Sequence, residues 1–355
     1  MATSSQKSVI VSHPLVNSIP PELAARFEPA YLEYYNKYSA GRLATHQVPI
    51  GEFRKDPAKY TPVYGRQLVD QGNLVITDHQ CPVDKPQGSI IVRVFQPDPS
   101  IPVARPRPAY INHHGGGWVF GGLANDFDFC KRLSLETGCV CFDVDYRLAP
   151  EYPYPIPVED SWTAFNWIRD HHEEFSIDLN RLAIGGCSAG GHLSAVTAIS
   201  SRDAGIPVLL QILSMPICDL HVFSPTTSTL LPDQSYDSYR EMYYSQPLPA
   251  ERVAYFHKHF LGGKSYEDGE WKVSPIRLRD FQGLAPALLI TAEMDPLRDE
   301  GEAYGKKLKD AGVTVEMHQI KGAPHTVMQM DDITEGGKLY NQIVVEALKG
   351  AFVVK

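Results

Sequence analysis

The chain has 355 residues with a formal net charge of −9, and 43% of its residues are hydrophobic while 21% are charged. A chain of this length buries a sizeable core without disulfides, and it contains no apolar run near the ~18 residues that a membrane span requires. The acidic balance, without any cluster of Lys and Arg, excludes the electrostatic attraction by which nucleic acids and anionic membranes are bound. We therefore expect a soluble protein, and small neutral molecules remain as candidate ligands.

The N-terminal sequence MATSSQKSVIVSHP lacks the apolar segment of a signal peptide, because only Val9, Ile10 and Val11 run together. We therefore expect a cytoplasmic protein. The six cysteines contain no C-x-x-C pair, and in a reducing compartment such thiols are usually small buried residues. This pattern predicts neither disulfides nor a zinc site.

From Asn73 onward, short β-branched runs alternate with helical stretches, which is typical of a mostly parallel sheet covered by helices. The eight strand candidates are 73–79, 89–95, 109–114, 139–146, 181–186, 208–213, 286–292 and 313–320. The first two are too close in sequence for a crossover helix, so we expect them to pair antiparallel. Helices are predicted over 125–138, 159–175 and 188–205.

Two stretches interrupt this alternation. Residues 1–65 contain the aromatic segment PAYLEYYNKYSAG, and residues 217–268 are rich in Ser, Pro and Tyr before the helical segment PAERVAYFHKHFLGG. Their apolar and aromatic content is too high for disordered tails. We expect the two stretches to pack together as a helical cap over a core formed by residues 66–216 and 269–355.

The segment IGGCSAGGH places Ser188 in a G-x-S-x-G pattern between a predicted strand and a predicted helix. This is the context of a nucleophile elbow, in which a tight turn exposes the serine hydroxyl. Glycines flank the serine because the turn leaves no room for side chains beside the neighbouring strand and helix. The N–H groups at the start of the helix also point at any oxyanion that develops there.

Upstream, His114 is followed by Gly115, Gly116 and Gly117 directly after a predicted strand. Three consecutive glycines allow backbone N–H groups to face a substrate carbonyl oxygen without obstruction. Each such donor contributes ~3 kcal/mol in the transition state. The segment therefore predicts an oxyanion loop.

A nucleophilic serine needs a base and an orienting acid, and in this arrangement the acid precedes the histidine in the sequence. Asp295 follows the predicted strand PALLITA, and His325 follows the predicted strand VTVEMHQI. The rival candidates are Glu293, Asp299 and His318. We favour Asp295 and His325 because His318 falls inside its strand and Asp299 falls on the next helix.

Five segments of the chain resemble the marks of the hormone-sensitive-lipase-like branch of the α/β-hydrolases. Those marks are H-G-G-G, D-Y-R-L-A-P-E, G-D-S-A-G-G, D-P-L-x-D and a late histidine. The corresponding residues are HGGGW at 114–118, DYRLAPE at 145–151, GCSAGG at 186–191, DPLRD at 295–299 and His325. The resemblance extends over residues 73–355.

This resemblance implies an α/β-hydrolase fold with a mostly parallel eight-stranded sheet, flanking helices and a helical cap. It implies a serine carboxylic-ester hydrolase that forms an acyl-enzyme, with neither metal nor cofactor. The implied nucleophile, base and acid are Ser188, His325 and Asp295, and the implied oxyanion donors are the N–H groups of Gly116, Gly117 and Ala189. We expect small soluble esters with short to medium acyl chains as substrates.

The chain departs from the family pattern at Cys187, where the family usually has Asp. A thiol at a helix N-terminus can be reactive through a lowered pKa, whereas a buried thiol is inert, and the sequence leaves both interpretations open. It also leaves open a ligand receptor or a dehydratase on the same scaffold, because fold does not fix function. The physiological substrate and a homo-oligomeric state are open as well.

Overall fold

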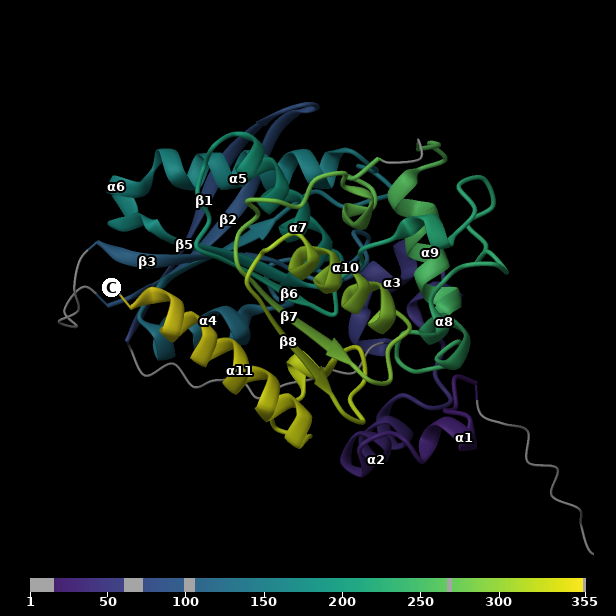
Figure 1. Cartoon of the computed structure of the whole chain (residues 1–355). Helices are drawn as coiled ribbons and strands as arrows, with labels where there is room; N and C mark the ends of the chain where they lie inside the picture. Colours follow the sequence, from purple (N-terminus) through teal and green to yellow (C-terminus); the bar gives the residue numbers. More distant parts are fainter. Residues whose placement is uncertain (1–15, 61–72, 99–105, 267–269, 354–355) are drawn as a thin grey trace, which may run out of the picture.

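One sheet of eight strands, ordered β1-β2-β4-β3-β5-β6-β7-β8, runs through the molecule (Figure 1). The computed structural model describes residues 16–60, 73–98, 106–266 and 270–353. The strands are β1 (Leu74–Asp84), β2 (Gln87–Pro97), β3 (Arg107–His113), β4 (Val140–Asp145), β5 (Ile177–Cys187), β6 (Leu210–Ser214), β7 (Ala287–Ala292) and β8 (Val315–Ile320). β2 pairs antiparallel with β1 and β4, and the remaining neighbours are parallel. The predicted strands and their antiparallel start are confirmed.

Helices cover both faces of this sheet. The helices α5 (Ile156–Asp170), α7 (Ala189–Asp203) and α10 (Arg298–Asp310) pack on one face, and α4 (Phe127–Thr137) and α11 (Glu335–Phe352) pack on the other (Figure 1). Because both faces are covered, central strands such as β3 are buried at every position. No helix in the described ranges is long and apolar enough to cross a membrane.

The predicted helices occur at the expected places, with one break. The stretch predicted as a single helix over 159–175 is divided at His171 into α5 and the short α6 (His172–Phe175). At the break, the Nδ1 atom of His171 lies 2.8 Å from the carbonyl oxygen of Trp167. All six cysteines are free thiols, and their predicted burial is confirmed.

The two stretches predicted as a cap form short helices that contact each other. They are α1 (Pro21–Ala24), α2 (Pro29–Tyr38), α3 (Ile50–Lys55), α8 (Asp237–Glu241) and α9 (Ala250–Leu261), grouped at one end of the sheet (Figure 1). Tyr31 Oη on α2 donates a hydrogen bond of 2.8 Å to the carbonyl oxygen of Gln246. Residues 1–15, 61–65 and 267–268 of these stretches lie outside the described residues. The division between cap and core stays a prediction.

A pair of buried carboxyl groups lies between β3, β4 and the start of α4. Asn112 Nδ2 donates to Asp143 Oδ1 at 2.9 Å and to Asp126 Oδ2 at 3.1 Å. Within the described part of the chain, Asp143 Oδ2 and Asn112 Oδ1 are buried acceptors with no hydrogen-bond partner. Burial, reinforced by the nearby Asp126, raises the pKa of Asp143 to about 8. Asp143 therefore keeps its proton at pH values where the unfolded chain has released it.

The protonated Asp143 makes stability depend on pH. Because its pKa is higher in the folded than in the unfolded chain, its stabilising contribution is complete below the unfolded value of 3.8 and is lost as the pH rises through about 8. We expect the melting temperature to fall between about pH 5 and about pH 9, and to fall less steeply in Asp143→Asn, which stays neutral. Calorimetry across this range measures how steeply the melting temperature falls with pH. Asp310→Asn, a surface change on α10, is the control, and equal slopes in the Asp143→Asn variant and the parent would contradict the assignment.

Candidate active site

Ser188 stands at the apex of a strained turn between β5 and α7. Its φ of 59° and ψ of −118° lie in a region that non-glycine residues rarely adopt. Backbone hydrogen bonds hold the turn. Ser188 N donates to the Ser214 carbonyl oxygen at 2.9 Å, and the Ser188 carbonyl oxygen accepts from His192 N at 3.0 Å and from Ile217 N at 3.4 Å. The strand-turn-helix context predicted from the sequence is therefore present, with the serine 7% exposed.

The glycines of this turn are required by the close approach of β3. A Cβ atom on Gly190 would lie 1.8 Å from the carbonyl oxygen of His113, and one on Gly186 would lie 2.3 Å from the same atom. Real Cβ atoms do not approach backbone oxygen so closely. The G-x-S-x-G spacing thus serves backbone packing as well as exposure of the serine.

The predicted oxyanion loop lies beside the elbow. A Cβ atom on Gly115 would be 3.8 Å from Ser188 Cβ. Gly116 and Gly117 have φ values of +117° and +62°, which favour glycine. In the described chain no backbone acceptor is bonded to the N–H of Gly116 or Gly117, and Ala189, the first residue of α7, has no intrahelical acceptor for its N–H. These are the three N–H groups that the resemblance implies as oxyanion donors.

A stacked pair of rings lies at the start of the predicted oxyanion loop. The His114 ring stacks on Tyr146 with centroids 4.2 Å apart, and Tyr146 Oη donates to the carbonyl oxygen of His114 at 2.8 Å. Burial lowers the pKa of His114 to about 4, so this histidine is neutral near pH 7. His114 Nδ1 lies 2.7 Å from the Gly115 carbonyl oxygen and donates to it. Tyr146 belongs to the DYRLAPE segment, which is the signal that marks it in the sequence.

Arg54 on α3 ties the loop to the chain that follows β4. Its Nη2 atom donates to the carbonyl oxygens of Val119 and Ala149, each at 2.8 Å. Its Nη1 atom pairs with Glu151 at 2.7 Å. Arg54 lies in no motif, so the sequence does not reveal its role. Its contacts join it to residues about 65 and 95 positions away in the chain.

Asp295 and His325 meet at the ends of β7 and β8. His325 Nδ1 lies 2.6 Å from Asp295 Oδ2, and Asp295 Oδ1 accepts a hydrogen bond of 3.0 Å from the N–H of Leu297. Asp295 is fully buried and His325 is 8% exposed. Because Nδ1 is engaged by the carboxylate, Nε2 is the nitrogen of His325 that remains to exchange a proton.

The rival residues are used elsewhere. Glu293 Oε2 accepts the N–H of Gly322 at 2.9 Å, and Asp299, on α10 as expected, accepts a backbone N–H at 2.7 Å. His318 lies inside β8 and pairs with the neighbouring Glu316. The observed partner of His325 is therefore the acid that the sequence favoured.

Ser188 and His325 lie at the same edge of the sheet, because β3, β5, β7 and β8 are parallel and the predicted site residues follow their carboxyl ends. In the described chain no hydrogen bond joins Ser188 Oγ to His325. Contacts between a nucleophile and its base are often long before substrate binds.

Cys187, next to the serine, is a buried thiol. Burial, with smaller contributions from the carboxyl groups of Asp126 and Asp295, raises its pKa well above the ordinary value. Its side chain belongs to an apolar cluster with residues of α4 and α11, including Phe129 and Tyr340. Burial in this cluster and the raised pKa favour the buried, inert thiol over the reactive thiolate.

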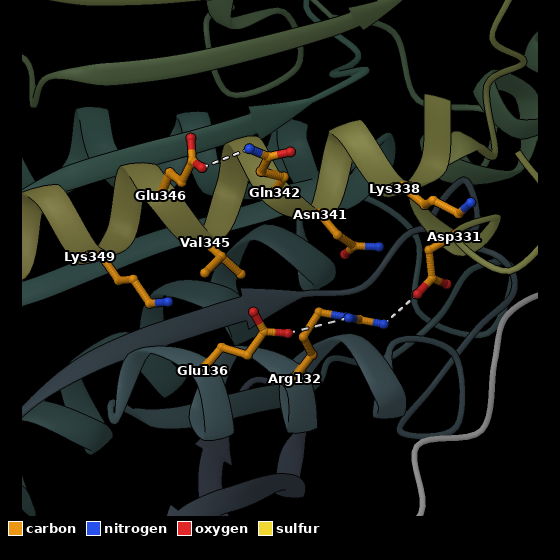
Figure 2. Close-up of a pocket in the computed structure, with 9 residues that line it drawn as sticks. All are labelled: Arg132, Glu136, Asp331, Lys338, Asn341, Gln342, Val345, Glu346 and Lys349. Atoms are coloured by element: carbon orange, nitrogen blue, oxygen red, sulfur yellow. Dashed lines mark hydrogen bonds and ion pairs between the residues drawn. The ribbon is translucent and has the colours of Figure 1, made fainter. Parts of the chain in front are cut away.

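A groove of about 300 Å³ lies between α4 and α11, and Figure 2 shows that its walls are polar and charged. Arg132 lies between Glu136 and Asp331 and pairs with both. None of the residues predicted for catalysis lines this groove. Elsewhere in the described ranges, no group of three His, Cys, Asp or Glu side chains is arranged to hold a metal ion.

Comparisons with known proteins agree with this geometry. The model of a family described as having the alpha/beta hydrolase fold matches residues 110–329. An AB hydrolase superfamily protein of Schizosaccharomyces pombe is 32% identical over 96% of this chain and 97% of its own, and the esterase LipI of Mycobacterium tuberculosis is 36% identical over 68% and 72%. The crystal structure of EstE1, a thermostable carboxylesterase from a metagenomic library, has a TM-score of 0.72 and 33% identity, covering 81% of this chain and 92% of its own.

The chain therefore belongs to the α/β-hydrolase fold family. Within it, the chain is a member of the hormone-sensitive-lipase-like branch, a branch of ester hydrolases.

The assignment of the acid can be tested by two matched substitutions. Asp295→Asn should lower kcat for an ester roughly 10⁴-fold, because the imidazole loses both its orientation and its charge support. Asp299→Asn should cost far less, because the amide oxygen still accepts the same backbone hydrogen bond. Steady-state kinetics on a chromogenic ester measures both values. A larger loss in Asp299→Asn than in Asp295→Asn would move the acid to Asp299.

Proposed function

We propose that the protein is a serine carboxylic-ester hydrolase in which Ser188, His325 and Asp295 form the catalytic triad. The observation that carries this proposal is the 2.6 Å pair of His325 and Asp295 at the same sheet edge as the strained elbow of Ser188. A serine with an adjacent base and a base with an orienting acid is the arrangement by which hydroxyl groups become nucleophiles.

The reaction proceeds in two halves. His325 Nε2 takes the proton from Ser188 Oγ as that oxygen attacks the ester carbonyl carbon, and the resulting oxyanion accepts hydrogen bonds from the N–H groups of Gly116, Gly117 and Ala189. The alcohol leaves with the proton from His325, so that Ser188 carries the acyl group. His325 then takes a proton from water as the water attacks the acyl-enzyme, and it returns that proton to Ser188 Oγ as the bond to the acyl group breaks and the acid leaves.

The cap limits the size of the substrate in this proposal. Phe256 on α9 lies against the oxyanion loop, where a Cβ atom on Gly117 would come within 2.2 Å of its ring. Phe256 also packs edge-to-face with Phe120 at 5.8 Å. Aromatic side chains that close over the loop suit small esters with short to medium acyl chains, whereas a lipase presents a broad apolar surface to fat. The cytoplasmic location remains a prediction from the sequence.

Replacement of the nucleophile tests the hydrolase mechanism. Ser188→Ala should fold as the parent does and lose several orders of magnitude of ester turnover, because no covalent intermediate can form. Hydrolysis of p-nitrophenyl acetate measures turnover, and circular dichroism checks the fold. A folded Ser188→Ala protein with most of the parent activity would end the proposal.

A receptor on the same scaffold would bind esters without turnover in the parent itself, and a dehydratase would eliminate water from its substrate.

Substrate size is tested by a series of p-nitrophenyl esters from acetate to palmitate. We expect kcat/KM to be highest for short and medium acyl chains, because Phe256 of the cap packs against the loop. We also expect no increase in rate when the substrate concentration passes the point at which an emulsion forms. Activation at the interface of a long-chain triglyceride emulsion would contradict this expectation and make the cap a lipid-operated lid.

A further inference from the structure

Two cap serines bracket the buried acid of the site. Ser245 Oγ donates to the carbonyl oxygen of Met294 at 2.5 Å, and Ser238 Oγ donates to the carbonyl oxygen of Pro296 at 2.7 Å. Met294 and Pro296 are the residues immediately before and after Asp295. Ser238 is 0% exposed and Ser245 is 1% exposed, so water does not compete for these hydrogen bonds.

A second set of hydrogen bonds joins Ser238 to α10, the helix that follows Asp295. Its N–H donates to Asp299 Oδ2 at 2.7 Å, and the N–H of Asp299 lies 3.2 Å from Ser238 Oγ. The next cap residue, Tyr239, donates through Oη to the buried Glu300 at 2.9 Å. The start of α8 is thereby joined to the start of α10, and the hydroxyl of Ser238 has one defined position.

The segment that carries Asp295 is also hydrogen-bonded to the segment that carries His325. Glu293 N donates to the carbonyl oxygen of Ile320 at 3.0 Å, and Met294 N donates to that of Ala323 at 3.0 Å. The backbone around Asp295 is therefore held by the β8 segment through its N–H groups and by the cap through its carbonyl groups. Removal of the cap contacts would free the two carbonyl groups that flank Asp295 from their side-chain donors.

From this arrangement we infer that Ser238 and Ser245 are positioning residues, which hold Asp295 at hydrogen-bond distance from His325. The inference rests on the proposed function, because it assigns the cap a part in orienting the triad. Neither hydroxyl is bonded to His325 or Ser188 in the described chain, so the two serines act through Asp295. Small displacements of an oriented catalytic group cost up to about 100-fold in rate.

The test compares Ser238→Ala, Ser245→Ala and the double variant with the parent in the full-length protein. We expect the double variant to lose about 10- to 100-fold in kcat on p-nitrophenyl acetate with a small change in KM, because orientation of the base matters most in the transition state. Ser134→Ala is the matched control. Ser134 is also buried and donates to the carbonyl oxygens of Phe95 and Cys139, at 3.0 and 2.9 Å, but lies in the core.

The loss in kcat should depend on Asp295 if the serines position it, whereas a general loss of stability would lower kcat in any background. In an Asp295→Asn background, the same double serine change should lower kcat less than about threefold, because the group through which the serines act is already disabled. An equal loss in both backgrounds would overturn the inference, and so would parent-like kcat in the double variant. If the Ala variants fail to fold, Ser238→Cys and Ser245→Cys keep a weak donor at each site and should give a smaller loss in kcat that again disappears with Asp295→Asn.

The outcomes also separate this inference from the proposed function. A parent protein without esterase activity, or an active Ser188→Ala variant, would refute the proposed function. A parent whose activity depends on Ser188 but not on the two cap serines would refute the positioning role alone.

Discussion

The contact of two glycines with one carbonyl oxygen is the constraint on which the site depends. Gly186 before the nucleophile and Gly190 after it both approach the oxygen of His113 at the end of β3. This approach fixes the elbow against the strand that leads into the oxyanion loop. The first glycine of the loop, Gly115, lies only two residues after His113. The same contact therefore sets the distance between the serine hydroxyl and the N–H groups that would stabilise an oxyanion.

Burial controls which groups near this contact carry charge. His114 and Cys187 both flank the site, and burial keeps the imidazole neutral and the thiol protonated near pH 7. The carboxyl group of Asp295 is instead hydrogen-bonded to His325 and to a backbone N–H group. The position of the His325 ring is therefore set by the Asp295 side chain, which leaves its Nε2 atom unoccupied by that contact.

The two segments outside the sheet do more than cover it. Arg54 from the first segment joins the predicted oxyanion loop, at the Val119 carbonyl group, to the chain after β4, at the Ala149 carbonyl group. Ser238 and Ser245 from the second segment bond to the carbonyl groups on either side of Asp295. Each is a polar side chain bonded to main-chain oxygen. Such bonds restrain the path of the chain rather than its side chains, and a segment distant in sequence can thus influence the geometry of the site.

The sequence by itself determined the order of strands and helices, the elbow, the glycine loop and the choice of Asp295 and His325. These follow from local periodicity and from the rule that parallel strands end at one edge, which places residues after β3, β5, β7 and β8 together. Only the tertiary structure decided the state of Cys187 and the supporting contacts of Arg54, Tyr146, Ser238 and Ser245. Burial and hydrogen bonds between segments far apart in the chain depend on three-dimensional packing, and no local pattern encodes which serine or arginine reaches a given carbonyl group.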